Sequence, residues 1–314
     1  MSGSKVINDD RVFDVFGRDF DRFKFPADVY RVTAGRGGEA LLIFGSERSA
    51  LLDCGMAFCG RRLAANIEKT LREHGRDKLD YVLLTHSHYD HMGALPYIRR
   101  AFPQATVCAS KKCAEILARP NARRLIKKLG TAARELYEPE SREEIIVSDL
   151  HIDRILYDGD IISIGEERLV ALETKGHTDC SMSYGLEPVR LLFTSESTGI
   201  IETSEYVDTP ILKDYNDAMI SMKKCMDYGA QYICLPHCGM IPKDFNDTYW
   251  KMFDEACRDR LEFVKEQSAM GFSNDEMAEN YIRKYWDPAL KQIQPLEAYA
   301  INSKAVIKAI LKAL

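Results

Sequence analysis

The sequence predicts an α/β protein of the α+β type in two parts: a mixed region of strands and helices over residues 1–242, and a helical extension over residues 243–314. Two observations carry this prediction. Short apolar runs of strand type alternate with amphipathic helical patterns as far as residue 235. After residue 243 no convincing strand remains, and the pattern is helical. We therefore expect the tail to pack onto the mixed region.

The opening of the chain predicts a meander of strands and then a helix. The expected strands are residues 29–32, 41–44 and 50–53, separated by turns that contain glycine. Residues 60–74 are typical of an amphipathic helix, because Leu63, Ile67 and Leu71 recur at every fourth position. Gly75 supplies the stop signal for that helix.

The middle of the chain continues the alternation. Further strands are expected at residues 81–84, 105–109, 152–157, 160–164, 168–173, 191–194 and 232–235. Helices are expected at residues 93–102, within 111–137 with an interruption at Pro120, and at 214–228. In the tail we expect helices at 244–270, from the capping-box pattern Ser273 to Glu276 onward, and from Pro295 to Leu314.

Composition narrows the class of protein. A net charge of -5 over 314 residues argues against a nucleic-acid binder, which needs a basic face. No apolar run reaches the roughly 18 residues of a membrane span, and residues 1–10 lack the apolar core of a signal peptide, so we expect a cytoplasmic protein. Nine cysteines without a CxxC pair indicate buried free thiols. We do not expect Cys234 or Cys238 to bind a metal.

The segment from Thr85 to His91 is the most informative in the chain. It places three imidazoles and a carboxylate within six positions, directly after the apolar run at 81–84: His86, His88, Asp90 and His91. Loops at strand ends commonly carry chemistry. The spacing differs from the i, i+4 pattern of a helical zinc motif, so these ligands are expected to fan out from an extended turn toward more than one metal.

Two more histidines follow apolar runs in the same way. His177 lies in Gly176-His177-Thr178 after the run at 169–174, and His237 lies in Pro236-His237-Cys238-Gly239 after the run at 232–235. A lone histidine at a strand end is more often a satisfied polar group, but the cluster at 86–91 favours ligands at both positions. His74 and His151 are expected to be surface or structural residues.

With these motifs the chain resembles the metallo-β-lactamase superfamily. The HxHxDH motif stands as His86, His88, Asp90 and His91, and the later elements stand as Gly176-His177-Thr178 and His237. The resemblance covers residues 29 to 242. It implies a four-layer αβ/βα sandwich with a binuclear site at one edge, in which His86, His88 and His177 bind one metal, and Asp90, His91 and His237 bind the other. It also implies that Asp53, at the end of an early strand, supports the ligands without binding a metal.

One position departs from the family pattern. The family normally supplies a bridging Asp after a strand that ends in a sequence like Leu-Phe-Thr-Gly-Asp-Thr, and this chain has Leu192-Phe193-Thr194-Ser195-Glu196-Ser197. The longer side chain of Glu196 moves the carboxylate by more than about 1 Å, while metal distances tolerate only about 0.2 Å. We expect Glu196 to bind metal, either as a bridge or terminally. On sequence grounds, Glu196→Asp is expected to preserve or strengthen metal binding.

The resemblance implies a metal-dependent hydrolase. Two divalent cations, zinc, iron or manganese, would generate a hydroxide that cleaves an ester-like bond, and Asp90 would orient the hydroxide or protonate the leaving group. A thioester is favoured, and a lactone and a phosphodiester stay open. The alternative is a regulatory or binding protein that keeps the fold and is catalytically weak because of Glu196.

Candidate substrate contacts come from residues near the ligands and from the tail. Tyr89, Tyr184 and Lys175 are expected to meet a small-molecule substrate, for which an acyl thioester is one candidate. If the tail covers the site, four aromatic residues are available to line a pocket, although ordinary helix packing is the more frequent role: Tyr281, Tyr285, Trp286 and Tyr299. We expect neither nucleic acid nor membrane as a partner, and keep a homodimer open.

Overall fold

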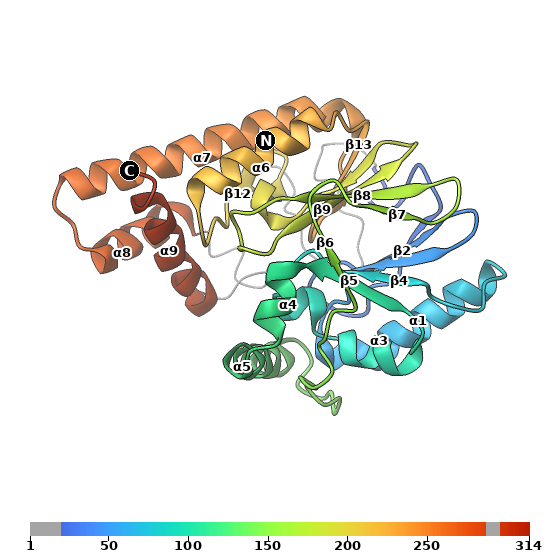
Figure 1. Cartoon of the computed structure of the whole chain (residues 1–314). Helices are drawn as coiled ribbons and strands as arrows, with labels where there is room; N and C mark the ends of the chain where they lie inside the picture. Colours follow the sequence, from blue (N-terminus) through green and yellow to red (C-terminus); the bar gives the residue numbers. More distant parts are fainter. Residues whose placement is uncertain (1–19, 287–295) are drawn as a thin grey trace.

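Two six-stranded sheets lie face to face in the computed structural model, which describes residues 20–286 and 296–314 (Figure 1). Sheet 1 contains β1 (Val29–Arg31), β2 (Leu41–Phe44), β3 (Ser49–Leu52), β4 (Tyr81–Leu83), β5 (Thr106–Ser110) and β6 (Arg154–Leu156), in this order. Sheet 2 has the order β14 (Gly239–Met240), β13 (Tyr232–Leu235), β10 (Leu191–Phe193), β9 (Met182–Glu187), β8 (Arg168–Glu173), β7 (Ile161–Ser163). A separate hairpin pairs β11 (Ile200–Thr203) with β12 (Tyr206–Asp208).

Strand directions bring several loops to one edge of the sandwich. In sheet 1, β3 and β4 are parallel. In sheet 2, β8 and β10 are both antiparallel to β9, and β13 is parallel to β10, so β8, β10 and β13 run the same way. The sheets are joined at this edge, because the backbone N–H of Met182 donates to the carbonyl of Thr85 at 2.8 Å. The loops that follow β3 and β4 of sheet 1 and β8, β10 and β13 of sheet 2 therefore lie at the same edge of the sandwich.

The core between the sheets follows from side-chain alternation along the strands. Leu41 and Ile43 of β2 point into the space between the sheets, where they join Tyr184 and Phe193 of sheet 2. Leu42, the residue between them, points to the other face and packs with the helices. Successive side chains of a strand point to opposite faces, so a strand covered on both faces reads as a continuous apolar run.

Helices cover the outer face of each sheet. Sheet 1 is covered by α1 (Gly60–Glu73), α3 (Leu95–Ala101), α4 (Lys111–Leu117) and α5 (Pro120–Tyr137). Sheet 2 is covered by α6 (Tyr215–Asp227) and by the first part of α7 (Asn246–Ala269). Burial of both sheet faces stabilises this arrangement at roughly 25 cal/mol per Å² of apolar surface. The predicted αβ/βα four-layer sandwich is confirmed.

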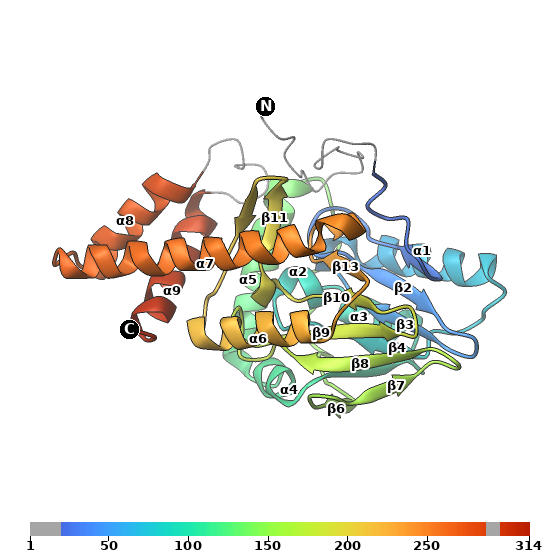
Figure 2. The same ribbon diagram turned by 90° about the horizontal axis from the view of Figure 1, so that it is seen from above.

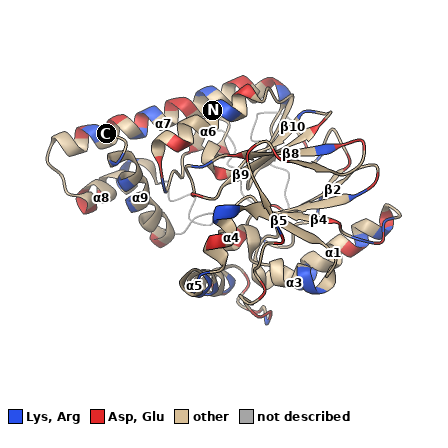
Figure 3. Cartoon of the chain, in the orientation of Figure 1, with Lys and Arg blue, Asp and Glu red and all other residues tan. Residues whose placement is uncertain are grey.

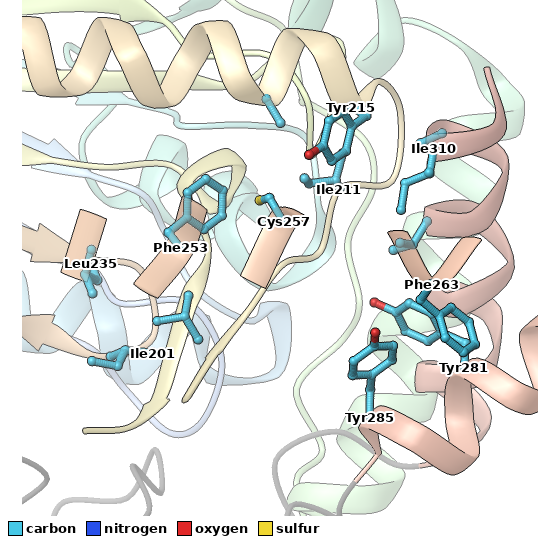
Figure 4. Packing of buried hydrophobic residues seen from close by; sticks show 14 of the residues in the cluster. Ile201, Ile211, Tyr215, Leu235, Phe253, Cys257, Phe263, Tyr281, Tyr285 and Ile310 are labelled. Carbon is cyan, nitrogen blue, oxygen red and sulfur yellow. The ribbon is translucent and has the colours of Figure 1, made fainter. Parts of the chain in front are cut away.

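The C-terminal helices extend past the end of the sandwich (Figure 2). They are the second half of α7, then α8 (Asn274–Tyr285) and α9 (Leu296–Leu311). The predicted capping box is present, since Ser273 and Glu276 bond each other's backbone N–H. One buried cluster joins these helices to sheet 2, from Leu235 through Phe253 to Tyr281 and Ile310 (Figure 4). The boundary between residues 242 and 243 stays a prediction.

The structure adds elements that the sequence did not predict. The strands β9, β11, β12 and β14 were missed, and the region at 89–102 is two helices, α2 (Tyr89–Met92) and α3. Three short 3-10 turns were also missed, namely η1 (Ala57–Cys59), η2 (Glu196–Thr198) and η3 (Lys243–Phe245). In β9 the outer positions hold Ser183 and Gly185, and a Cβ at Gly185 would lie 2.4 Å from the ring of Tyr228. Close helix packing thus requires small residues that weaken the strand signal.

Some predictions concern residues outside the described part of the chain. These are the absence of a signal peptide in residues 1–10 and the start of the last helix after Pro295. Within residues 20–286 and 296–314, no helix is both long and apolar enough to cross a bilayer.

Candidate metal centre

The seven predicted ligands meet at the edge of the sandwich where four strands end. They come from the loops after β4, β8, β10 and β13 and form two groups, within each of which the ligand atoms lie no more than 4.8 Å apart. The first group is His86, His88 and His177, and the second is Asp90, His91, Glu196 and His237. The fold therefore unites residues that are up to about 150 positions apart in sequence, because the carboxyl ends of co-directed strands share one edge.

The first group presents only nitrogen atoms. His177 Nε2 lies 3.0 Å from His88 Nδ1. His86 is fully buried, and its Nε2 has no hydrogen-bond partner among the described residues. A buried polar atom without a partner costs about 1–3 kcal/mol. The nearby Glu196 Oε1 is 3.6 Å from His86 Nε2, too far for a hydrogen bond, so this nitrogen stays without a partner among the described residues.

The second group combines imidazoles with carboxylates. The Nε2 atoms of His91 and His237 lie 3.1 Å apart, and each lies 3.6 Å from Asp90 Oδ2. Asp90 and His91 sit on the single turn of α2, directly after the extended segment that carries His86 and His88. This turn directs the second half of the HxHxDH motif toward a different point from the first half.

Glu196 lies between the two groups. Its Oε1 is 2.7 Å from His91 Nε2 and 3.2 Å from His237 Nε2, and its Oε2 is 3.3 Å from His177 Nε2. The residue is buried in η2, where the side chain of Ser195 accepts a hydrogen bond from the N–H of Ser197. Oε2 therefore faces the first group, whereas Oε1 faces the second group and also lies 3.6 Å from His86 Nε2 of the first.

The outward ring nitrogens of two histidines are held by backbone carbonyls. His177 Nδ1 donates to Pro210 O at 2.6 Å, and His237 Nδ1 donates to Gly37 O at 3.1 Å. Once Nδ1 carries the proton, the neutral ring presents an unprotonated Nε2 to the centre. Backbone contacts thus select the tautomer that suits a metal ligand.

Asp53 orients His91 directly and His86 through the hydroxyl of Thr85. Its Oδ2 accepts from His91 Nδ1 at 2.8 Å and from Thr85 Oγ1 at 2.7 Å. Since the Thr85 hydroxyl donates to Asp53, it accepts from His86 Nδ1 at 3.0 Å. Oδ1 of Asp53 accepts the Thr85 N–H at 2.8 Å. Asp53 therefore lies where the resemblance implied, supporting both halves of the motif.

The two groups differ in their electrostatics. Burial, followed by the neighbouring imidazoles, lowers the pKa of His86 well below its usual value, and burial and His177 lower that of His88 to about 4. Burial also opposes protonation of His91 and His237, but the carboxylates of Asp90, Asp53 and Glu196 outweigh it and raise both pKa values. The surrounding imidazoles hold the pKa of Glu196 well below its usual range despite burial.

This donor set fits divalent cations. Imidazole nitrogen atoms converge in the first group, where burial lowers the pKa values of His86 and His88. Carboxylates complete the second group, with the pKa of Glu196 held low. Imidazole and carboxylate together suit zinc, iron and manganese. Cations would also provide the partner that His86 Nε2 lacks among the residues described.

A glycine-rich loop at residues 35–38 covers part of the centre. The N–H of Gly38 donates to Asp90 O at 3.0 Å, and a Cβ there would lie 2.8 Å from both Asp90 O and His91 Nδ1. Only glycine allows this approach. Beside it, the guanidinium of Arg36 lies 5.6 Å from the ring centre of Tyr137, whose pKa is raised by burial and by Asp90.

Arg36 and Tyr137 were missed by sequence reasoning. The turn at 35–38 was recognised, but not its position over the ligands. Tyr137 is the last residue of α5, 46 positions after His91, and only packing brings it near Asp90. Tyr89, which was predicted, is half-buried in α2 and packs near Tyr137 in the same small cluster.

Other predicted contacts lie elsewhere. Tyr184 requires a correction: it is fully buried between the sheets and donates to Leu84 O at 2.9 Å, so it is part of the core and not exposed to substrate. Lys175 pairs with Glu173 at 3.0 Å. In the tail, Tyr281 and Tyr299 line a small cavity together with Pro210, which holds His177.

The remaining tail aromatics and the cysteines have packing roles. Tyr285 stacks on the buried guanidinium of Arg260 at 4.2 Å, and Trp286 packs against the cluster that joins the helices to sheet 2. All nine cysteines are buried free thiols, as expected. Cys234 and Cys238 belong to neither ligand group.

Comparison with known proteins agrees with this architecture. The family described as the Metallo-beta-lactamase superfamily matches residues 34–237. The chain is 25% identical over 204 residues to the metallo-beta-lactamase fold-containing protein ST1585 of Sulfurisphaera tokodaii, a match that covers 62% of this chain and 75% of that protein. The solved structure of TTHA1429, a metallo-beta-lactamase family protein of Thermus thermophilus, superposes with a TM-score of 0.59 at 18% identity, covering 91% of this chain and 92% of that one.

A third relative is named for its reaction. The atrochrysone carboxyl ACP thioesterase of Aspergillus fumigatus is 25% identical over 195 residues, which cover 58% of this chain. The matched region spans only half of that protein's length. Because the family match includes every ligand of both groups and most of both sheets, the conclusion is direct. This chain belongs to the metallo-beta-lactamase superfamily.

Proposed function

We propose that this protein is a metal-dependent hydrolase of ester-like bonds, with a thioester as the favoured substrate. The observation that carries the proposal is the position of Glu196, whose two carboxylate oxygens face two separate ligand groups. That arrangement suits two divalent cations, zinc, iron or manganese, at one edge of the fold. Such a cation pair supplies a hydroxide at neutral pH and polarises the oxygen of the scissile carbonyl.

Asp90 is the residue we assign to proton transfer. Its Oδ2 lies 3.6 Å from two imidazole nitrogens, and its side chain is 19% exposed. Thioester hydrolysis breaks the C–S bond and forms a C–O bond from water, so that the products are a carboxylic acid and a thiol. The thiol leaves with one proton of that water, and Asp90 is placed to carry it.

The rim of the centre supplies the substrate contacts. Tyr89, which directly precedes Asp90, packs against the same small cluster as Tyr137, and the guanidinium of Arg36 lies over the Tyr137 ring. We assign to Arg36 a contact with an anionic group of the substrate. We expect Arg36→Ala to raise KM for a substrate with a carboxylate or phosphate, with little change in kcat, because a rim cation binds ground state and transition state alike. An unchanged KM would remove Arg36 from the substrate site.

The choice of a thioester draws on a relative. The Aspergillus fumigatus protein is named an atrochrysone carboxyl ACP thioesterase, and its match to this chain is 25% identical over 195 residues. This level of identity supports the thioester without excluding lactones or phosphodiesters. Pocket shape, and not the fold, selects among these.

The experiment combines metal content with a substrate panel. Protein purified without chelator or metal-affinity column is measured by elemental mass spectrometry and assayed with thioester, lactone and phosphodiester substrates. We expect about two metal equivalents per chain and fastest turnover of thioesters. A matched His88→Ala protein should lose turnover and metal together. Two bound metals without turnover of any panel member would overturn the hydrolase proposal in favour of a regulatory or binding role.

A further inference from the structure

The helix α5 carries an apolar stripe on its solvent side. Leu125, Leu129 and Leu136 expose 55%, 36% and 55% of their surfaces and are separated by four and seven residues, which places them on one helical face. The helix already buries a different face through Ile126 and Ala133. Single exposed leucines are ordinary, but an ordered row of them along one helix is typical of a docking surface for another helix.

Basic side chains flank this stripe. Residues 111–137, which include all of α4 and α5, contain eight Lys or Arg and two acidic residues, Glu115 and Glu135. The rest of the chain then holds 35 basic and 46 acidic residues out of totals of 43 and 48. Blue segments mark the basic residues of α5 in Figure 3. A strongly positive helix on an acidic protein is a localised charge that selects acidic partners.

The positive charge is largely uncompensated. Within residues 20–286 and 296–314, the ion pair of this segment joins Lys112 to Glu115 at 3.9 Å. Arg123 and Arg134 bind the backbone carbonyls of Leu117 and Glu143, which leaves their charge intact. The side chains of Arg124 and Lys128, one turn apart beside the stripe, are exposed.

The same helix ends at the metal centre. Tyr137 closes α5 and packs against the same small cluster as Tyr89, the residue directly before Asp90. Ala133 is buried with Met56 in the small cluster beneath α2. At about 1.5 Å per residue, Leu125 lies about 18 Å along the axis from Tyr137. A partner seated on the stripe would therefore be within reach of the centre only through an extended arm.

We propose that the α5 surface, defined as Arg124, Leu125, Lys128, Leu129 and Leu136, docks a small acidic helical carrier protein that presents its acyl thioester on a flexible arm. An acidic amphipathic helix of the carrier packs its apolar residues on the leucines and its carboxylates on Arg124 and Lys128. The arm then follows α5 to Tyr137 and delivers the thioester beside Asp90. This inference rests on the thioesterase function proposed above, and it identifies the form in which the substrate arrives.

The test separates docking from chemistry. Binding of a carrier protein with its phosphopantetheine arm is measured by fluorescence anisotropy, and turnover is measured with octanoyl-loaded carrier and with S-octanoyl-N-acetylcysteamine. We compare the wild-type metal-loaded protein with Arg124→Glu/Lys128→Glu and with Leu125→Ser/Leu129→Ser. The control is Lys69→Glu/Arg72→Glu, an equal charge reversal at exposed positions of α1.

Both α5 variants should weaken carrier binding at least about tenfold and raise KM for the loaded carrier by a similar factor. Turnover of the small thioester should stay within about twofold, and the α1 control should resemble wild type. Wild-type binding should also weaken as salt screens the charges. Failure to hydrolyse either thioester would reject the proposed function, whereas carrier binding that is unaffected by the α5 changes would reject the docking surface. Preferential binding of phosphatidylglycerol vesicles over the carrier would likewise overturn it.

Discussion

The two ligand groups of the metal centre differ in charge and in how their surroundings affect protonation of the histidine rings. His86, His88 and His177 form a group of nitrogen ligands, in which burial favours the neutral rings of His86 and His88. The group of Asp90, His91, Glu196 and His237 contains two carboxylates, which favour protonated imidazoles when no cation is bound. One motif, HxHxDH, thus contributes to two environments because a single helical turn begins between His88 and Asp90.

This difference indicates how the sites would fill. A cation entering the carboxylate group meets opposite charge but competes with the protons that the carboxylates favour on His91 and His237, whereas burial already disfavours protonation of His86 and His88. Glu196 couples the two, since its oxygens contact both. Three variants and one titration test whether the groups differ in this way.

Asp90→Asn should have the largest effect. It keeps the size of the side chain but removes the charge that distinguishes the second group and the carboxylate assigned to proton transfer. We expect kcat to fall by roughly 100-fold or more, with loss of metal mainly from the second group. Kinetics and metal content measure the two effects, and Asp149→Asn, at an exposed acid, is the control. Nearly normal kcat would show that Asp90 carries no proton.

Glu196→Asp should uncouple the groups. The structure reverses the expectation from sequence, because η2 places the backbone so that the full length of Glu reaches His91 and His177. Shortening by one C–C bond withdraws the carboxylate by about 1.5 Å, well beyond the tolerance of a metal site. We expect about one metal equivalent in place of two. Retention of two equivalents would mean that the turn at 195–198 adapts to the shorter side chain. Glu196→Gln keeps the length of the side chain but removes its charge, so it shows which of the two properties metal binding requires.

Thr85→Val should weaken both groups moderately. The hydroxyl accepts a hydrogen bond from His86 Nδ1 and donates one to Asp53 Oδ2. Its loss leaves a buried imidazole N–H without an acceptor and removes a donor to Asp53. We expect metal affinity to fall about 10- to 100-fold and the free energy of unfolding to fall by about 1–3 kcal/mol. Calorimetric metal titration and chemical denaturation provide the measurements. Thr106→Val, at the opposite end of neighbouring β5, should change affinity little.

Titration of the metal-free protein should give the smallest and most specific signal. His88, with a folded pKa of about 4, contributes stability that is present at neutral pH and is lost as pH falls below its unfolded value of about 6.5. His237 has a raised pKa, so its contribution is present below about 6.5 and is lost as pH rises through the folded value. Imidazole NMR should resolve the two titrations on opposite sides of about 6.5. Coincident titrations would remove the distinction between the groups.

Sequence reasoning performed best where a local pattern has one physical solution. The helix at α1, the strands β2, β8 and β13, and the break at Pro120 were predicted within one residue, because apolar periodicity and the missing N–H of proline act locally. It failed at β9, where Ser183 and Gly185 are small because helix residues pack on them. It also failed for Tyr184, which is close to the ligands in sequence but is buried in the core.

The ligands and the family of the fold can be recognised from residue type and order, because imidazoles and carboxylates follow the strand-like runs. The division into two groups, the contacts of Glu196 with both, and the link from Asp53 to His86 through Thr85 arise only when the chain folds. The same is true of the packing of Arg36 on Tyr137. These relations depend on packing between segments far apart in the chain, and side-chain contacts at that range leave no periodic pattern in the sequence.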